Sequence, residues 1–400
     1  MINRENSPFT PGNPVPVELF VGRTEQIQEI LRYVGQTISG KQENIFLSGE
    51  RGIGKSSLAS FIRQYVIRKQ NMIGIHVFLG RVTTLEGIVR HVFDQILKET
   101  KNESWFSNIK NLFGKYIENV DLFGISVSFS PPNDQLKELV RNFPQALFNL
   151  LEKIKNTKSG ILIILDDVNG VVENSEFANW FKSLVDEVAT HYDKFPILFN
   201  LLGLPEKRDA LSHLQPSLMR IFRVVDIEKL SDEEVGDFFE KAFSKACMII
   251  KPEAMKILIQ YSSGLPILMH EIGDAVFWTV NNNEITQNHA LQGISVAANN
   301  IGKKYLDPLV YRAIRSERYR SILRKIGQMP TIFRKKDVEI KLTESEKKVF
   351  HNFLQRIKDL GVISSDIESG PGVYRFVNEI YRLYISMESI RYSLEKTKKS

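Results

Sequence analysis

Gly49-Glu50-Arg51-Gly52-Ile53-Gly54-Lys55-Ser56 is the stretch that decides the fold of this 400-residue chain. It matches the phosphate-loop pattern G-x-x-x-x-G-K-[ST] in full. The apolar run 44–47 precedes it, and apolar residues at helical spacing over 58–66 follow it. A glycine turn with an incidental lysine is the alternative interpretation, but a strand before the loop and a helix after it are the context that the phosphate-binding pattern requires.

The residue types of this loop suit a nucleoside triphosphate with Mg²⁺. Glycines let the backbone come close to phosphate groups, and the positive end of the following helix attracts them. Lys55 is predicted to bridge the β- and γ-phosphates, and the hydroxyl of Ser56 to ligate Mg²⁺. We therefore expect ATP and Mg²⁺ to bind here, with these residues in contact: Gly49, Glu50, Arg51, Gly52, Ile53, Gly54, Lys55, Ser56 and Ser57.

A second strand supplies acidic residues. The apolar run 161–165 ends in Asp166 and Asp167. Asp166 is predicted to share the Mg²⁺ with Ser56, and Asp167 to polarise the attacking water by accepting its proton. A strand that ends in a polar turn is the alternative, and the phosphate loop upstream favours the functional interpretation.

Three further positions are candidates. Asn200, on an apolar run, suits a hydrogen bond to the γ-phosphate or the attacking water, although asparagines also serve as turn partners. Arg220 suits the neutralisation of charge on a neighbouring subunit's nucleotide, or is a solvated surface arginine. Gly264-Leu265-Pro266 ends one helix and starts the next, which by itself is ordinary helix punctuation.

Composition narrows the class of protein. The chain is 42% hydrophobic and 25% charged, which is typical of a globular protein, and its length predicts two or three domains. Its single cysteine, Cys247, excludes an internal disulfide and favours the cytoplasm. No apolar run is long enough to cross a bilayer, so a membrane partner is not expected. The net charge of +6 is too small to decide for or against nucleic acid.

Hydrophobic periodicity predicts an α/β fold in which helices alternate with the strands of a parallel sheet. Short apolar runs predict the strands of that sheet: residues 44–47, 73–79, 161–165 and 196–202. An alternating segment over 120–129 suggests a strand or hairpin. Residues 361–363 and 373–377 flank a turn at 369–372, which predicts a second hairpin. Helical spacing covers these segments: 24–34, 58–66, 85–97, 135–154, 319–326 and 345–360.

The order of these elements predicts the domain organisation. Residues 1–16 contain four prolines and predict an extended arm. An α/β ATPase domain is expected next, with an insertion at about 100–134; a capping box at Ser231 then opens a helical lid, and a winged helix and a basic tail follow. The predicted bounds are 17–230 for the α/β domain, 231–302 for the lid, 303–388 for the winged helix and 389–400 for the tail.

Four segments together resemble a known family. They are Phe20-Val21-Gly22-Arg23-Thr24-Glu25, the loop at Gly49, the Asp166-Asp167 strand and Gly264-Leu265-Pro266. They look like the prokaryotic P-loop ATPases that link the AAA+ and STAND classes, the archaeal ATPase group akin to the origin recognition ATPases. The resemblance spans roughly residues 16–386 and implies a sandwich with helices on both faces of the sheet, a helical lid and a winged helix.

The resemblance also implies residue roles. Phe20, Val21 and Gly22 would line the adenine pocket, and Pro266 would lie near the base and ribose. Asn200 would be the first sensor and Arg220 the arginine finger. Two departures matter: Asp167 stands where many AAA+ members have glutamate, and residues 267–270 lack the usual second-sensor arginine. The first departure suits slow hydrolysis, and the second means that His270 substitutes or that the role is absent.

We therefore expect an ATPase that acts as a nucleotide-driven conformational switch, converting ATP and water to ADP and phosphate. One alternative is a DNA-binding module in which ATP sets the conformation of the winged helix; another is a scaffold for a protein client, which includes a second copy of the chain as an arginine finger requires. Positive charge for the DNA alternative comes from one region, in which Asp307 and Glu317 dilute it: Arg312, Arg315, Arg318, Arg320, Arg324 and Lys325.

Overall fold

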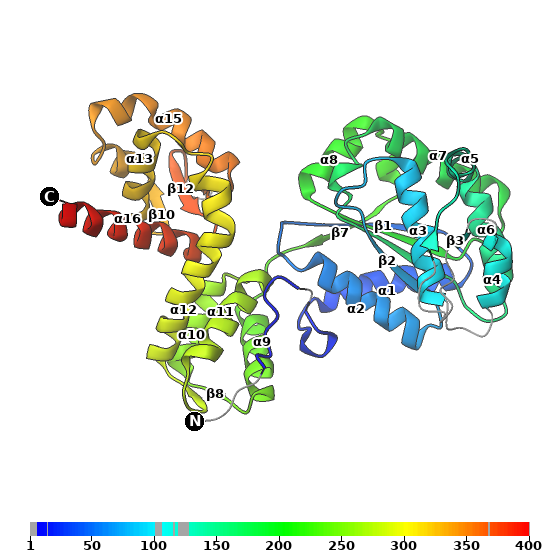
Figure 1. The fold of residues 1–400 in the computed structure, drawn as a ribbon, viewed down its shortest axis with the longest axis horizontal. Coiled ribbons are helices and arrows are strands. Elements are labelled where there is room, and N and C mark those ends of the chain that lie inside the picture. The colour runs from blue at the N-terminus through cyan, green and yellow to red at the C-terminus, as the bar shows by residue number, and fades with distance from the viewer. Residues whose placement is uncertain are drawn as a thin grey trace. The chain divides into compact units, whose positions relative to one another are not determined.

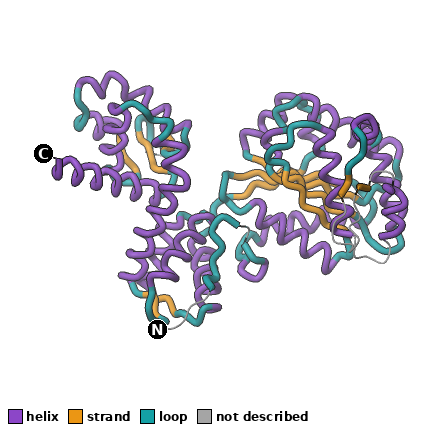
Figure 2. Tube along the Cα trace, viewed as in Figure 1, coloured by secondary structure: helices purple, strands orange, loops and turns teal. Residues whose placement is uncertain are grey.

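The structure is a computed structural model that describes residues 6–13, 15–100, 106–114, 117–118, 128–366 and 369–399. The chain divides into two compact units, which Figures 1 and 2 show as ribbon and tube. We call residues 14–228 the sheet domain. We call residues 1–13 together with 229–400 the helical domain.

A parallel five-stranded sheet forms the centre of the sheet domain, in the order β2-β5-β6-β1-β7. Every residue of β1, β5 and β6 is buried, as expected for strands with helices on both faces. This confirms the predicted α/β fold. The strand bounds are β1 (Glu43–Gly49), β2 (Ile73–Phe78), β5 (Ile161–Asp166), β6 (Ile197–Gly203) and β7 (Arg223–Ile227).

Helices cover the two faces of this sheet (Figure 1). One face packs against α1 (Thr24–Ile38) and α2 (Lys55–Lys69). The helices whose apolar residues share the core of the other face are α3 (Leu85–Thr100), α5 (Asn133–Arg141), α6 (Phe143–Ile154) and α7 (Ser175–His191). The single helix expected over 135–154 is therefore two helices, because Pro144 has no N–H for a preceding turn and suits only the first turn of α6.

Strand register brings distant residues to one edge of the sheet. Ser48 lies opposite Gly203, and Gly49 lies opposite Ile227. Asp166, at the end of β5, is the register partner of Phe78. The carboxyl ends of all five parallel strands thus meet at the edge where the phosphate loop leaves β1, which is where open α/β sheets bind ligands.

The predicted insertion at 100–134 is described only in part. It contains α4 (Phe106–Phe113), the two-residue strands β3 (Ile117–Glu118) and β4 (Ser128–Phe129), and the start of α5. β3 and β4 pair antiparallel. The hairpin expected over 120–129 falls mostly on residues 119–127, which lie outside the described residues.

The helical domain begins with a bundle. Its capping box is as predicted, since Glu234 N–H donates to Ser231 Oγ over 3.2 Å and Ser231 N–H to the Glu234 carboxylate over 2.8 Å. A π-helix (Gly302–Tyr311) continues the last helix of the bundle. The elements are α9 (Asp232–Lys245), β8 (Ile249–Ile250), α10 (Pro252–Ser262), α11 (Pro266–Thr279), β9 (Glu284–Ile285) and α12 (Gln287–Ile301).

The C-terminal part of the helical domain has its own core. Its antiparallel sheet has the order β10-β12-β11, which confirms the hairpin expected around residue 369. The hydrophobic pattern of the sequence did not predict β10, because this strand is only three residues long. The elements are α13 (Glu317–Gly327), β10 (Ile332–Arg334), α14 (Lys335–Glu339), α15 (Glu344–Asp359), β11 (Ile363–Ser365), β12 (Val373–Phe376) and α16 (Glu379–Lys399).

The predicted tail at 389–400 is not a separate segment. α16 runs from Glu379 to Lys399, and Ser389 is buried where it accepts a hydrogen bond from Gln328 over 3.2 Å. The guanidinium of Arg324 also lies 3.8 Å from the ring centroid of Tyr392. The segment expected as a separate basic tail is thus the continuation of α16. Among the described residues, no helix has the length and apolar character needed to cross a membrane.

Candidate functional site

The phosphate loop has the backbone that a phosphate cradle needs. Gly52 and Gly54 have φ angles of 78° and 101°, in the left-handed region where a side chain is disfavoured. α2 begins at Lys55, and no side chain caps this end. The backbone N–H donors of its first turn are therefore available to an anion.

Lys55 is folded back on its own loop. Its Nζ donates to the carbonyl oxygens of Gly49 and Glu50, over 2.6 and 2.9 Å. Burial lowers the pKa of Lys55, and the negative charges of Asp166 and Asp167 counteract part of that shift. The structure thus brings together the lysine and both carboxylates that the sequence nominated from segments far apart.

Asp166 has a partner that the sequence did not reveal. Its side chain is buried, and its Oδ2 accepts a hydrogen bond from His76 Nε2 over 2.8 Å. The imidazole of His76 stacks on the ring of Phe78, with centroids 4.4 Å apart. A single histidine on an apolar strand carries no recognisable signal, because only the pairing of β2 with β5 places it here.

Asp167 differs from Asp166 in its exposure and backbone. It is exposed, and its φ of 57° is left-handed. Asn169 Nδ2 donates to Asp167 Oδ1, while Asn169 Oδ1 accepts the backbone N–H of Leu204 over 3.2 Å. Asn169 therefore ties the second carboxylate to the turn after β6. Sequence reasoning missed this residue, although its position two residues after Asp167 in a polar turn was visible.

Arg23 connects the phosphate loop to the end of the sheet domain. It is only 7% exposed, with a left-handed φ of 61°. Its Nη2 donates to the carbonyl oxygen of Ile53 over 3.1 Å, and its Nη1 donates to the carbonyl oxygen of Glu228. The sequence placed Arg23 in a family motif but assigned it no contact.

The residues expected to line the adenine pocket include Phe20, which lies beside α2. The ring of Phe20 stacks on that of Phe61, with centroids 4.9 Å apart, and Val21 and Gly22 are partly buried. The hydroxyl of Ser57 accepts the backbone N–H of Val15 over 3.1 Å, so its oxygen is engaged by the chain segment before Phe20. The contact of these residues with adenine stays a prediction.

Asn200 lies within β6 rather than at its tip. It is fully buried opposite Ile45 and Ile164, and neither atom of its side-chain amide has a hydrogen-bond partner among the described residues. A buried amide without partners costs free energy, so this position has a stability cost that packing alone does not explain. Its role as a first sensor stays a prediction.

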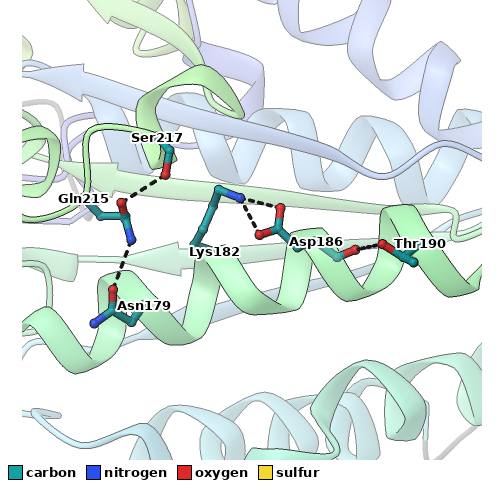
Figure 3. A network of polar contacts seen from close by, with 6 residues as sticks. All are labelled: Asn179, Lys182, Asp186, Thr190, Gln215 and Ser217. Carbon is teal, nitrogen blue, oxygen red and sulfur yellow. Dashed lines mark hydrogen bonds and ion pairs between the residues drawn. The ribbon is translucent and has the colours of Figure 1, made fainter.

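Arg220 is exposed at the end of a short 3₁₀-helix before β7. The segment leading to it is held to α7: Ser217 Oγ donates to Gln215 Oε1 over 3.0 Å, and Gln215 Nε2 donates to Asn179 Oδ1 over 3.1 Å (Figure 3). In the described part of the chain, no side chain or backbone group binds the Arg220 guanidinium. A fixed base and a free guanidinium are compatible with the predicted finger, which stays a prediction.

The two lid candidates lie in the helical domain. Pro266 begins α11, and its contact with the base stays a prediction. His270 is 3% exposed; its Nδ1 accepts the backbone N–H of Thr10 over 3.0 Å, and burial lowers its pKa to about 4. His270 is therefore neutral at pH 7 and does not supply the positive charge of a second sensor.

The segment that binds His270 is the proline-rich arm. Phe9 is buried and packs edge-on against the rings of Phe238 and Phe243. A Cβ added to Gly273 would come within 2.2 Å of the Phe9 ring, so only glycine leaves room for it. The arm is thus part of the core of the helical domain, which its composition did not reveal.

The residues present fit ATP and Mg²⁺. The left-handed glycines leave the loop without side chains where phosphates would approach, and Lys55 supplies a cation beside them. Ser56, in the first turn of α2, and Asp166 are oxygen donors of the kind that Mg²⁺ prefers. In the described part of the chain no group donates a hydrogen bond to Asp166 Oδ1, so this oxygen is free for a metal.

Comparison with known proteins agrees with this geometry. Residues 19–202 match the AAA ATPase domain family. The fold is similar to a Walker-type ATPase of Pyrococcus abyssi, with a TM-score of 0.55, 16% identity and coverage of 92% of this chain and 96% of that one. It is also similar to the Aeropyrum pernix ORC2 protein solved as ADPNP-ADP complexes, with a TM-score of 0.60, 13% identity and coverage of 97% and 98%.

A sequence relative is an uncharacterized HTH-type transcriptional regulator of Methanocaldococcus jannaschii. It is 21% identical over 238 residues, which are 57% of this chain and 54% of the relative. The match thus spans about half the length of that protein. Together with the phosphate loop, the parallel sheet and the acidic strand, these similarities show that residues 19–202 match the AAA ATPase domain family and that the chain has the fold of the archaeal ORC2 and Walker-type ATPase structures.

Proposed function

We propose that this chain is a nucleotide-driven conformational switch that binds ATP with Mg²⁺ and hydrolyses it slowly to ADP and phosphate. The observation that carries the proposal is the position of Arg23, whose guanidinium binds both Ile53 in the phosphate loop and Glu228. Glu228 is the last residue of the sheet domain, and the chain enters the helical domain at Lys229. A movement of the loop on nucleotide binding therefore acts on the residue that precedes the helical domain.

Each residue of the site has its own proposed role in binding the phosphates or the metal. Lys55 would exchange its two carbonyl partners for the β- and γ-phosphates, which are stronger acceptors because they are charged. Ser56 and Asp166 would hold Mg²⁺. The metal supplies positive charge against the phosphate oxygens. Backbone N–H groups of the first turn of α2 would complete the cradle.

Asp167 would accept the proton of the attacking water, since it is exposed and held in place by Asn169. Its side chain is one methylene shorter than the glutamate of many AAA+ proteins, which supports slow turnover. His270 is buried and neutral, so residues 267–270 supply no second-sensor charge. Asn200 and Arg220 are proposed as sensor and as finger in trans.

The test compares ATP binding and hydrolysis by the native chain, Lys55→Ala and Asp167→Asn. We expect Lys55→Ala to lose measurable binding, because its ammonium is the group proposed to bind the β- and γ-phosphates. Asp167→Asn should bind ATP like the native chain and lose hydrolysis by about 10²–10⁴-fold. Lys69→Ala, at the far end of α2, is the matched control and should behave like the native chain. Unchanged binding and hydrolysis in both site variants would contradict the proposal.

The switch also predicts a nucleotide-dependent assembly. A finger in trans requires a second copy of the chain next to the γ-phosphate. The solution mass should therefore increase with a non-hydrolysable ATP analogue and not with ADP, and Arg220→Ala should leave ATP binding intact but lower hydrolysis. If the mass is the same with both nucleotides, the chain acts as a monomeric switch and the finger role is wrong.

A second candidate function is DNA binding, which the exposed face of α15 favours. The order α13-β10-α14-α15-β11-β12 supports the proposed winged helix, in which α15 would be the recognition helix. The Methanocaldococcus jannaschii relative of this chain is named as an HTH-type regulator. Most exposed residues of α15 are polar or basic, types suited to phosphates and base edges: Lys347, Lys348, His351, Asn352, Gln355 and Arg356. The acidic exposed residues Glu344 and Asp359 lie at its two ends, and Glu344 pairs with Lys347.

Three of the basic residues of α13 nominated from the sequence are already engaged, since Lys325 binds Glu346 and two arginines also have partners. Arg320 donates to the carbonyl oxygens of Ile314 and Tyr311, and Arg324 binds Glu317. The positive charge for DNA is thus better placed on α15 than on α13.

A gel-shift titration over salt tests this candidate. Phosphate contacts make the logarithm of the affinity fall by about 0.9 per contact for each tenfold rise in salt. We expect Lys348→Ala and Arg356→Ala each to reduce that slope by about one contact, whereas Lys256→Ala, which removes an exposed charge from α10, should not. An affinity that does not change with salt would favour the remaining alternative, a protein-interaction domain.

A further inference from the structure

His76 and Asp166 form a pair across two strands of the sheet. Phe78 is the register partner of Asp166, and His76 is the register partner of Ile164, so His76 faces Asp166 diagonally. The two side chains meet at 2.8 Å, and they are 10% and 7% exposed. The pair is therefore nearly shielded from water, where a hydrogen bond constrains a side chain more strongly than at the surface.

The chemistry of the two side chains determines which of them donates the hydrogen bond. An ionised carboxylate only accepts hydrogen bonds, so Nε2 of His76 carries the proton and donates it to Asp166 Oδ2. The imidazole plane is in turn held by Phe78, whose ring lies 4.4 Å away at an interplanar angle of 18°. Phe78 is 61% exposed, an unusual position for a phenylalanine, and the stack on His76 is the ring contact it makes among the described residues.

We propose that His76 is a positioning residue that presents Asp166 to Mg²⁺, an inference that rests on the proposed ATP site. The hydrogen bond occupies Oδ2 and fixes the plane of the carboxylate. Oδ1, which receives no hydrogen bond among the described residues, is then directed to the metal. Outer partners of this kind orient metal ligands, and their loss commonly costs about 10–100-fold in metal affinity.

Three variants distinguish the effect of the His76 hydrogen-bond donor from the effect of its aromatic ring. His76→Phe keeps an aromatic ring for Phe78 and removes the hydrogen bond. His76→Gln removes the stack but places an amide N–H at about the distance of Nε2, and His76→Asn carries the same amide one methylene shorter. The pair of amide variants keeps the test decisive where His76→Phe does not fold.

The measurement is the affinity for a fluorescent ATP analogue, first in EDTA and then over a Mg²⁺ titration. In EDTA all three variants should match the native chain, because among the described residues no hydrogen bond, ion pair or ring contact joins His76 to the phosphate loop. The Mg²⁺ concentration at half-maximal tightening should rise about 10–100-fold in His76→Phe and His76→Asn. His76→Gln should stay within about threefold of the native midpoint, which a merely structural role would not produce.

Each other outcome overturns the positioning role. A native midpoint in His76→Phe or His76→Asn means that the hydrogen bond does not orient the ligand. A lower midpoint means that His76 competes with the metal for Asp166. Failure of the ATP site itself is distinct, because the native chain would then show no Mg²⁺-dependent tightening at all.

Discussion

Arg23 and Ile53 are joined by a hydrogen bond from the guanidinium to the backbone carbonyl, over 3.1 Å. The arginine lies just before α1, and the carbonyl lies in the phosphate loop. Because the same guanidinium also binds the carbonyl oxygen of Glu228, a single planar group spans the loop and the exit of the sheet domain. The two carbonyls bind different nitrogens of the guanidinium, Nη1 and Nη2, whereas all donors of a lysine lie on one nitrogen, so lysine would not match this geometry.

Replacement of Arg23 should therefore break the link between the phosphate loop and Glu228, the residue that follows β7. We expect Arg23→Lys to lower the free energy of unfolding by about 1–3 kcal/mol, through loss of charge-assisted hydrogen bonds in a buried place. Amide exchange at residues 226–232 should then no longer differ between the ADP state and the state with a non-hydrolysable analogue. Arg32→Lys, an exposed arginine of α1, is the control. A nucleotide-dependent difference that persists in Arg23→Lys would refute the coupling.

Removal of Asn169 should slow hydrolysis without weakening binding. Its amide holds Asp167 Oδ1 and the Leu204 N–H, so Asn169→Ala leaves Asp167, the proposed proton acceptor, without its orienting contact. We expect kcat to fall about tenfold or more, since a small misplacement of a proton acceptor is costly. ATP affinity should stay native. Asn149→Ala, on the exposed face of α6, checks for a general effect of the substitution; equal kcat in both variants would show that Asn169 does not orient Asp167.

Acid should destabilise the helical domain through His270. The ordinary pKa of histidine is 6.5, and burial lowers that of His270 to about 4. Between these values the unfolded chain binds a proton that the folded chain does not. The free energy of unfolding should thus fall by roughly 3 kcal/mol as pH drops from about 6.5 to about 4.

Urea unfolding of the native chain and of His270→Asn checks this. The asparagine oxygen can accept the Thr10 N–H, and the residue does not titrate. We expect the stability difference between the two proteins to move in favour of the variant over that pH range. His213→Asn, at an exposed histidine of α8 (Pro205–Leu214), is the control and should show no such change. Parallel pH curves for His270→Asn and the native chain would rule the assignment out.

Glu346 should stabilise the domain in a lower pH range. Burial would raise its pKa, but hydrogen bonds from Lys325, Ser321 and Thr343 outweigh burial and lower the pKa from 4.5 to about 2. A lowered carboxyl pKa contributes stability that is complete above about pH 4.5 and is lost as pH falls to about 2. The contribution is roughly 3 kcal/mol at neutral pH.

The comparison of Glu346→Gln with the native chain tests this value. The variant should be less stable at pH 7, and the difference should shrink below pH 4.5, as measured by urea unfolding. The exposed Glu344 lies two residues away on the same helix and forms a surface pair with Lys347. Glu344→Gln should therefore have little effect, and an equal loss in both variants would mean that Glu346 is not specially held.

The parts of the site that sequence determined are those formed by consecutive residues. The phosphate loop requires glycine at its left-handed positions and lysine at the start of a helix, and each of these preferences is local. The continuous apolar runs of β1, β5 and β6 likewise predict that both faces of the sheet are covered, because only buried strands tolerate such runs. The loop, the parallel sheet and the acidic strand could therefore be read without any tertiary contact.

Tertiary structure alone decided the partners. His76 meets Asp166 because β2 pairs with β5 in one register, and Asn169 meets Leu204 because the turns after β5 and β6 lie at the same edge. Arg23 and His270 owe their burial to segments more than 200 residues away, Glu228 and Thr10. Residue type and spacing carry no information on such pairs, since the order of strands and the docking of the arm depend on the free energy of the whole packed core rather than on any local preference.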